Sequence, residues 1–298
     1  MISVDPGTLV PIQARMQAAA RTLRLPLRNQ AWRGMNGAWL GTGTGSSIDF
    51  QDHRPYLPGD DPRGIDWQAY ARSGNYTMKL YREEVAPGVD LALDVSASMA
   101  VDPSKAARTL ELFAFAVASA LQARGALRCY FLCGENVTPL PAEAALSAQR
   151  VAEVCQAAAG QDAASEAETP ALHRVPWRTG SLRVWISDLL FPGAPSLHAL
   201  AAGKGRGVVY TPWSAAEAEP RWDGNVEFVD CETGARRNQR VTPGLLGGYG
   251  EAYTRHFTLW REHARRLGVA FARIPAEPDF LAALRQEALP QGAVEAVV

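Results

Sequence analysis

Short apolar runs alternate with longer amphipathic stretches along most of this chain, and this alternation restricts its fold more than any other feature. From about residue 87 onward, runs typical of buried strands are separated by stretches in which apolar residues recur every three or four positions. A strand, a helix and a second strand form the βαβ unit, which builds a parallel sheet covered by helices. We therefore predict an α/β protein with a doubly wound, mostly parallel sheet flanked by helices.

The individual elements are predicted from local pattern. Several candidate strands are apolar throughout, as strands buried on both faces are, and the candidates span 89–94, 127–133, 182–187, 208–211, 226–229 and 269–274. In the clearest helix, the apolar side chains recur at i, i+3, i+4 and i+7. This helix covers 104–124, and further helices are predicted over 142–159, 196–202, 249–267 and 278–289.

Residues 1–86 differ in character from the rest of the chain. They contain a candidate early helix, a glycine-rich stretch over 41–45, and an extended run over 76–85. The glycine-rich stretch lacks the Gly-Lys-Ser/Thr of a phosphate-binding loop, so we expect a flexible loop there. We divide the chain into an N-terminal subdomain or elaboration, residues 1–86, and an α/β domain, residues 87–298.

Two of the predicted strands end in an aspartate. Asp94 begins the pentad Asp-Val-Ser-Ala-Ser, which places the hydroxyls of Ser96 and Ser98 behind it, and Asp188 follows the strand 182–187. Ligands of open α/β sheets bind at the carboxyl ends of the strands, so neighbouring strands would bring both carboxylates into one crevice. At about 5 Å and an effective dielectric constant of about 20, two bare carboxylates repel by roughly 3 kcal/mol. A divalent cation would remove this repulsion.

Carboxylate and hydroxyl oxygens favour a hard cation. Mg²⁺ fits this set because it keeps several waters and takes one or two protein carboxylates, whereas Ca²⁺ collects more oxygen ligands. Mn²⁺ is a chemically reasonable substitute. Such a site leaves coordination positions for water and an incoming ligand, which predicts docking. The alternative is an ordinary Asx turn or helix cap after a strand.

The stretch from Arg54 to Arg72 mixes turn-forming residues with acids and arginines. One interpretation is an internal network of ion pairs, because Arg and Asp can pair through two hydrogen bonds. The other is a surface that faces a partner or forms a wall of the metal crevice. Both remain open from the sequence.

Four segments, taken in order along the chain, indicate a family. The string Arg54-x-Tyr-x-Pro-Gly-Asp-Asp-x-Arg-x-Ile-Asp-Trp67, followed by the pentad at Asp94, by Ile-Ser-Asp188 and by Asp230-x-Glu-Thr-Gly, covers much of the chain. This order resembles the bacterial domain of unknown function 58 family, which has a von Willebrand factor A-like domain. The likeness extends over most of the chain from about residue 40.

The resemblance implies a metal-ion-dependent adhesion site. Asp94, Ser96 and Ser98 would form its first loop, and Asp188 would belong to its third loop. A threonine would come from the middle loop, for which Thr169 fits best and Thr138 is the alternative. The paired aspartates and the two hydroxyls, with no general base or nucleophile nearby in sequence, predict an adaptor without enzymatic activity that captures a carboxylate of another protein through Mg²⁺. The resemblance further implies that it works with a MoxR-type AAA+ ATPase on a client protein.

Two other functions use the same residues. One is a metal-dependent hydrolase in which the ion activates water, and the other is a structural scaffold whose pentad is only a turn. An aspartyl-phosphate phosphatase of the haloacid dehalogenase type is disfavoured, because it needs a second Asp two residues after the first. Ser96 takes that place and is a poor proton donor at neutral pH.

Charge and composition indicate which classes of partner and which cellular compartment to expect. With 30 Lys+Arg against 31 Asp+Glu, the chain has no overall attraction for nucleic acid or an anionic membrane. No signal-peptide pattern and no apolar stretch long enough to span a bilayer is present, so we expect a cytoplasmic protein without a transmembrane segment. Neither histidine of the predicted helix 249–267 has a ligand partner at metal-binding spacing, so we expect His256 and His263 to be solvated or half-buried.

The four cysteines lack CxxC spacing and are expected to be reduced core residues: Cys129, Cys133, Cys155 and Cys231.

Overall fold

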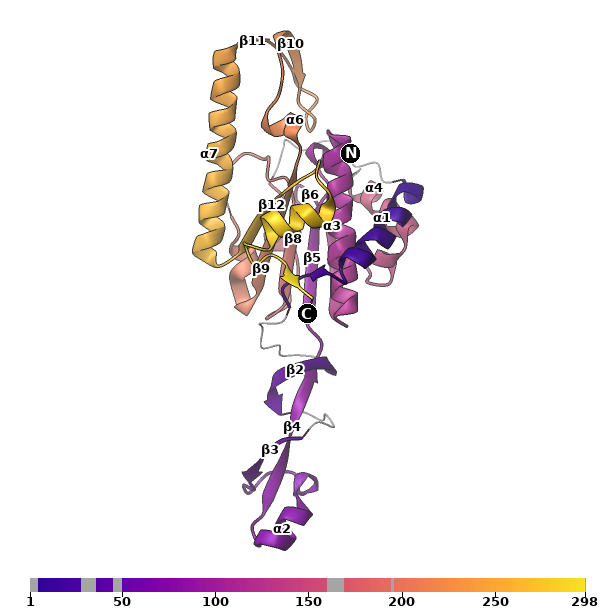
Figure 1. Cartoon of the computed structure of the whole chain (residues 1–298), viewed down its shortest axis with the longest axis vertical. Coiled ribbons are helices and arrows are strands. Elements are labelled where there is room, and N and C mark those ends of the chain that lie inside the picture. The colour runs from indigo at the N-terminus through magenta and orange to yellow at the C-terminus, as the bar shows by residue number, and fades with distance from the viewer. Residues whose placement is uncertain (1–4, 28–35, 45–49, 160–168, 194–195, 298) are drawn as a thin grey trace.

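A large α/β body and an arm of antiparallel strands make up the molecule (Figure 1). The computed structural model describes residues 5–27, 36–44, 50–159, 169–193 and 196–297. A six-stranded sheet lies at the centre of the body, in the order β12-β9-β8-β5-β6-β7. Its strands are β5 (Gly88–Asp94), β6 (Ala126–Cys133), β7 (Asn136–Leu140), β8 (Leu182–Ile186), β9 (Arg206–Trp213) and β12 (Ala270–Pro275).

The sheet is parallel except at one edge, where β7 pairs antiparallel with β6. From β5, the chain first adds strands on one side, β6 and then β7, and afterwards on the other side, β8, β9 and β12. The direction of winding therefore reverses between β5 and β8. In an open α/β sheet, such a switch point leaves a crevice at the carboxyl ends of the two strands. The mostly parallel α/β architecture predicted from the sequence is confirmed.

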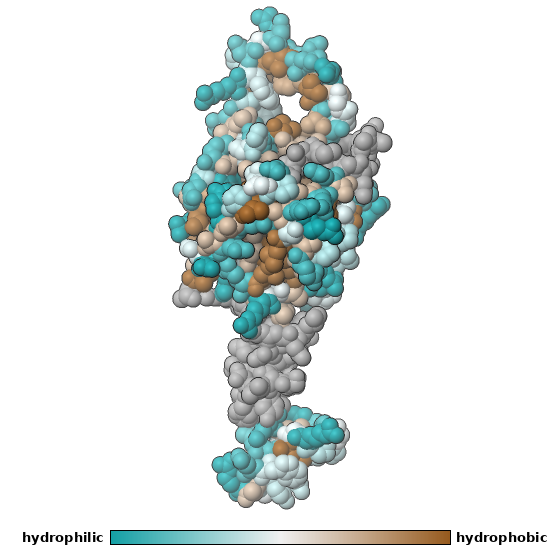
Figure 2. All heavy atoms as spheres, turned by 90° about the vertical axis from the view of Figure 1, so that its right-hand side faces the viewer, coloured by the Kyte–Doolittle hydropathy of each residue, from teal (hydrophilic) through white to brown (hydrophobic). Residues whose placement is uncertain are grey.

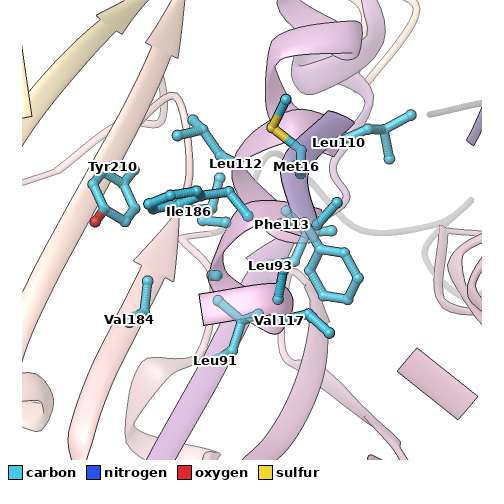
Figure 3. Packing of buried hydrophobic residues seen from close by; sticks show 14 of the residues in the cluster. Met16, Leu91, Leu93, Leu110, Leu112, Phe113, Val117, Val184, Ile186 and Tyr210 are labelled. Carbon is cyan, nitrogen blue, oxygen red and sulfur yellow. The ribbon is translucent and has the colours of Figure 1, made fainter. Parts of the chain in front are cut away.

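Helices cover both faces of the sheet, because each strand buries alternate side chains on opposite faces. Leu91 and Leu93 of β5 belong to one apolar cluster and Ala92 between them to the other. The first cluster packs β5 against α1 (Pro6–Ala19), α3 (Pro103–Gln122) and α4 (Ala148–Ala159), as Figure 3 shows for Phe113 and Val117 of α3. The second packs the other face against α5 (His198–Ala201) and α7 (Pro243–Leu267).

The first 27 residues take part in the core of the body. Leu9, Ile12 and Met16 of α1 belong to the same cluster as β5 and α3. The two-residue strand β1 (Leu23–Arg24) then pairs antiparallel with β13 (Glu295–Ala296), which follows the last α-helix, α8 (Phe280–Ala283), in sequence. Residues 6–27 therefore pack with the body, although they precede the division predicted at residue 86.

The arm consists of β2 (Asn36–Thr44), β3 (Phe50–Pro55) and β4 (Thr77–Val85), in the order β2-β4-β3. The short helix α2 (Trp67–Ser73) lies at its far end (Figure 1). Residues 41–44 belong to β2, so the loop expected over 41–45 is wrong for these four positions, and residue 45 lies outside the described residues. β4 runs into β5 with only Ala86 and Pro87 between them.

A β-hairpin of β10 (Gly224–Val229) and β11 (Arg236–Val241) lies outside the central sheet, between the short helix α6 (Ala215–Ala218) and α7. The predicted strand 226–229 therefore exists but pairs with β11 instead of joining the parallel sheet. Cys231 lies in the turn of this hairpin and is exposed, which corrects the expectation that all four cysteines are in the core; the other three are buried. Within the described residues, the helices are too short or too polar to cross a membrane.

Candidate functional site

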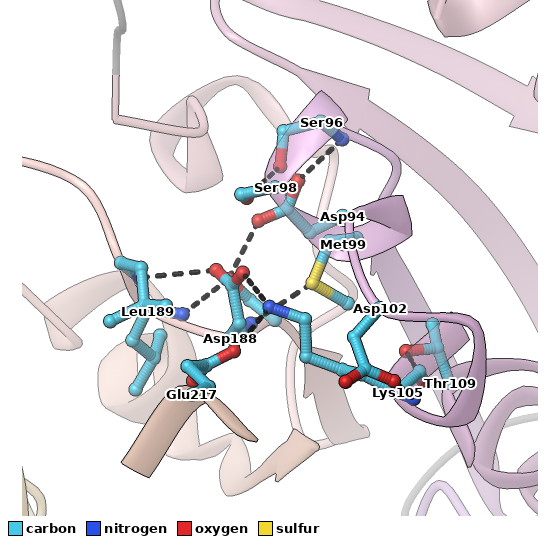
Figure 4. Close-up of polar contacts among 12 residues, drawn as sticks. Asp94, Ser96, Ser98, Met99, Asp102, Lys105, Thr109, Asp188, Leu189 and Glu217 are labelled. Atoms are coloured by element: carbon cyan, nitrogen blue, oxygen red, sulfur yellow. Dashed lines mark hydrogen bonds and ion pairs between the residues drawn. The ribbon is translucent and has the colours of Figure 1, made fainter. Parts of the chain in front are cut away.

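The two predicted aspartates lie together at the switch point of the sheet. β5 and β8 are neighbours, with Leu93 paired to Ile186. Asp94 ends β5, and Asp188 follows the end of β8 by two residues. Both side chains point into the space between the loops that follow these strands (Figure 4), and both residues are only 1% exposed.

Asp94 is held by hydroxyl and amide donors. Its Oδ1 accepts from the backbone N–H of Ser96 at 3.0 Å, and its Oδ2 accepts from the hydroxyl of Ser187 at 2.6 Å. The hydroxyl oxygens of Ser96 and Ser98 are 3.1 Å apart, on the same side of the loop (Figure 4). Across the described part of the chain, no Lys, Arg or His forms an ion pair with Asp94. Burial, reinforced by the negative charge of Asp188, raises the pKa of Asp94 to about 6, although its hydrogen bonds oppose this shift.

A lysine that the sequence did not single out neutralises Asp188. Lys105 lies in the first turn of α3, which is capped by the side chain of Asp102. Its Nζ donates to Asp188 Oδ2 at 3.0 Å and to Glu217 Oε2 at 2.6 Å, and its side chain is only 3% exposed. Burial alone would lower the pKa of Lys105, but the two carboxylates outweigh it and raise this pKa. Burial also raises the pKa of Glu217, which comes from α6.

The charges of this cluster do not balance. Asp94, Asp188 and Glu217 supply three carboxyl groups, and Lys105 supplies one ammonium group. A buried carboxylate without a positive partner is costly, which is why its pKa rises. Among the described residues, no three His, Cys, Asp or Glu side chains are grouped so that they could hold a metal ion. Beside Asp94, the further side-chain oxygens of the same loop are the hydroxyls of Ser96 and Ser98.

A fourth carboxylate reaches the same loop from the hairpin. Glu232 lies in the turn between β10 and β11. Its Oε1 accepts from the backbone N–H of Ser98 at 2.8 Å, and its Oε2 accepts from the N–H of Ala97 at 3.3 Å. These contacts join segments 134 and 135 residues apart in sequence. The only sequence signal for this residue is the Asp230-x-Glu-Thr-Gly string, which gives no indication of the contact.

The structure places the two candidate threonines differently. Thr169 is exposed, and its hydroxyl donates to the carbonyl of Pro192, in the loop that follows β8. Its neighbour Ala171 donates from its N–H to Gly134 at the carboxyl end of β6. Thr138 lies on β7, two strands from β5, which is about 10 Å at the usual strand spacing. Within the described residues, neither hydroxyl forms a hydrogen bond to Asp94, Ser96 or Ser98.

The stretch from Arg54 to Arg72 is in the arm, whereas the paired aspartates are at the opposite end of β5 (Figure 1). Arg54 donates two hydrogen bonds of 2.6 Å to Asp60, and this pairing lowers the pKa of Asp60 to about 2. Asp66 accepts from the backbone at the start of α2 and from Nε2 of His53 at 2.7 Å. The segment thus contains the internal ion pairs of the first interpretation, and it forms no wall of the aspartate crevice.

The two histidines of α7 have structural contacts within the body. His256 Nε2 lies 2.8 Å from the carbonyl of Leu189, and His263 Nε2 accepts from the N–H of Leu197. Both side chains are half-buried, as expected.

Fold and site define the class of this protein: an α/β protein with a six-stranded, mostly parallel sheet that carries a cluster of acids and serines at its switch point. The chain belongs to the family described as "Protein of unknown function DUF58", which it matches over residues 52–256. The family predicted from the sequence is confirmed. The match includes the far part of the arm, the switch point and the hairpin with Glu232.

Relatives of similar length are known in mycobacteria. Uncharacterized proteins of Mycobacterium tuberculosis and Mycobacterium bovis are 27% identical to this chain over 278 residues, which is 90% of this chain and 87% of each relative. Among solved structures, the conserved hypothetical protein BatB from Bacteroides thetaiotaomicron is 12% identical and matches 69% of this chain and 98% of its own, with a TM-score of 0.35.

Proposed function

We propose that this protein is a Mg²⁺-dependent adaptor with a von Willebrand factor A-like body, which binds a carboxylate of another protein at a metal-ion-dependent adhesion site. The observation that carries the proposal is Asp94, a fully buried carboxylate at the switch point that faces Asp188 and has no cationic partner among the described residues. A site that is short of positive charge and rich in oxygen donors suits a hard divalent cation.

The residues present fit Mg²⁺, or Mn²⁺ as a substitute. Asp94, Ser96 and Ser98 would hold the ion, with Asp188 next to it and Thr169 as the proposed contribution of the middle loop. When bound, the ion would neutralise the buried carboxylates and offer a coordination position to an incoming carboxylate. The chain's own groups orient the loop: Ser187 and the N–H of Ser96 fix the Asp94 carboxylate.

We further propose that the partner is a MoxR-type AAA+ ATPase, with which the chain acts on a client protein in the cytoplasm. The support for this step is membership of the family, together with the serine hydroxyls that lie beside the buried Asp94. Capture of the ATPase by the full chain should need Mg²⁺. Capture that is unaffected by a chelator would remove the docking role. Hydrolysis of a phosphoester or peptide that is lost in Asp188→Ala would instead favour the hydrolase.

Replacing Asp94 by asparagine is expected to weaken Mg²⁺ binding by about a hundredfold, since it removes the only charged ligand of the proposed first loop. Titration calorimetry of Mg²⁺ into the wild type and Asp94→Asn at pH 7 measures this change. Asp223→Asn is the matched control, because Asp223 is an exposed acid outside the site, and it should bind as the wild type does. Equal affinity in all three proteins would discard the site.

The raised pKa of Asp94 predicts how the stability of the metal-free protein depends on pH. Its carboxyl has a pKa of about 6 in the folded state against 3.8 as the ordinary value, so the folded state binds this proton more tightly than the unfolded state. The stabilisation is complete below about pH 4 and is lost as pH rises through about 6, at 1.36 kcal/mol per pKa unit. We expect a loss of as much as about 3 kcal/mol, because the group is fully buried.

Urea unfolding in a chelator between pH 4 and pH 7.5 measures this loss. Since other groups also titrate, the quantity to compare is the difference between the wild type and Asp94→Asn, in which the asparagine cannot titrate. The stability of the wild type should fall relative to that of the variant over this range. Parallel curves would contradict the assignment of an uncompensated charge to Asp94.

A further inference from the structure

The hairpin of β10 and β11 presents Glu232 on a well-defined turn. All six residue pairs from Gly224 with Val241 to Val229 with Arg236 are in register. The Asp230 side chain accepts from the N–H groups of Glu232 and Thr233 at 2.9 and 2.8 Å. Gly234 has a φ of +70°, which favours glycine over other residues, and its N–H donates to the carbonyl of Asp230. The turn thus fixes the backbone that carries the glutamate.

The contact of Glu232 with the Asp94 loop uses both of its carboxylate oxygens. One accepts from Ser98 N–H and the other from Ala97 N–H, the two residues that end the Asp-Val-Ser-Ala-Ser pentad. Hydrogen bonds to a charged acceptor are the stronger kind. A carboxylate of this chain therefore already lies against the loop at which the proposed function places a partner's carboxylate.

The remainder of the hairpin is loosely attached to the body. Most of its residues are exposed on both strands. Trp222 connects it to α7 through ring contacts, at 5.0 Å to Phe228 and 5.5 Å to Tyr249. A cavity of 380 Å³ lies between the hairpin and the start of α7, and the space-filling view shows an opening at this end of the molecule (Figure 2). Segments with few buried contacts open at a low free-energy cost.

We propose that Glu232 is a built-in competitor for this docking site, so that a partner's carboxylate binds only when the hairpin tip leaves the Asp94 loop. This inference rests on the proposed function and adds its regulation. It also defines the chemistry of the partner: the ligand that displaces Glu232 is an acidic side chain, because Glu232 holds the loop through its carboxylate. If the tip is in contact in about nine molecules of ten, it weakens the apparent affinity for such a ligand about tenfold.

The contact itself is tested by amide hydrogen exchange of the full chain. In Glu232→Ala, the N–H groups of Ala97 and Ser98 lose their acceptor, and we expect them to exchange about tenfold faster than in the wild type. Glu227→Ala is the matched control, since Glu227 is on the same hairpin and, among the residues that the structure describes, forms its ion pair with Arg236 and none with the Asp94 loop. It should leave both amides unchanged. Protected amides of β10 and β11 in both variants would show that the hairpin stays folded. Equal exchange at Ala97 and Ser98 in all three proteins would overturn the proposal.

Competition is tested with glutarate as the probe. In saturating Mg²⁺, glutarate should bind Glu232→Ala about tenfold more tightly than the wild type or Glu227→Ala. Equal affinity for glutarate in the three proteins, with Mg²⁺ bound, would overturn the competitor while leaving the docking site intact. Absence of Mg²⁺ binding in all three would overturn the proposed function, and the competitor with it, whereas the exchange experiment would still decide whether Glu232 contacts the loop.

Discussion

Replacing Lys105 by methionine is expected to lower the free energy of unfolding of the metal-free protein by about 3 to 5 kcal/mol at pH 7, because removal of one partner leaves buried charge without compensation. Lys105 donates to both Asp188 and Glu217, and its side chain is almost completely buried. Methionine keeps much of the aliphatic length of lysine, so the loss reports mainly on the charge. Urea unfolding in a chelator measures the effect.

The control for this variant is Lys204→Met, because Lys204 is exposed and remote from the acids. A surface substitution of this kind should change stability by no more than about 0.5 kcal/mol. Added Mg²⁺ should stabilise Lys105→Met more than it stabilises the wild type, because the variant has lost the only cation of the cluster. If Lys105→Met unfolds at the same urea concentration as Lys204→Met, then Lys105 does not neutralise Asp188.

Replacing Arg178 by methionine is expected to cost about 3 to 5 kcal/mol for the same physical reason, at the opposite end of β5. Asp90 is completely buried, and Arg178 binds it through Nε at 2.7 Å and through its backbone N–H at 2.8 Å. The guanidinium also donates to the carbonyls of Val89 and Ala126, at the starts of β5 and β6. The variant therefore loses the ion pair with Asp90 and the two hydrogen bonds from the Arg178 side chain to backbone carbonyls of β5 and β6.

The matched control here is Arg174→Met. Arg174 pairs with Glu135, but both side chains are largely exposed, and exposed pairs contribute at most about 1 kcal/mol. Adding Asp90→Asn to Arg178→Met should recover part of the lost stability, since it removes the uncompensated carboxylate. If the double variant is no more stable than Arg178→Met, the loss comes from the carbonyl contacts and not from the buried charge.

The parallel strands of the body were predictable because a strand that is buried on both faces is a nearly continuous apolar run in the sequence. The apolar runs at 89–94 and 182–187 correspond to β5 and β8 within one residue at each end. β7 and β11 were missed, since β7 is a short edge strand with a proline and β11 is mostly polar. The predicted strand 226–229 was assigned to the wrong sheet, because an apolar run does not identify its pairing partner.

The acidic half of the site was predictable, and its other contacts were not. Two aspartates at the ends of parallel strands must lie near each other once the strands are neighbours, and β5 and β8 are. Lys105 and Glu217 meet across 112 residues of sequence, and Glu232 reaches Ser98 across 134. These three residues lie on a helix, a short helix and a turn, whose positions depend on how the whole body packs. No local sequence pattern predicts contacts between residues so far apart in the chain.

The independence of the arm from the body has a consequence for evolution. The described arm side chains, residues 53–79, enter neither apolar cluster of the body, and the Arg54–Asp60 pair and the stacked rings of Tyr70 and Tyr76 lie within the arm. Mutations at its far end, where Trp67 is 58% exposed, leave the packing of the body unchanged. Natural selection can therefore remodel that end to recognise a new molecule while the acidic crevice is conserved, and it can alter the crevice without redesigning the arm.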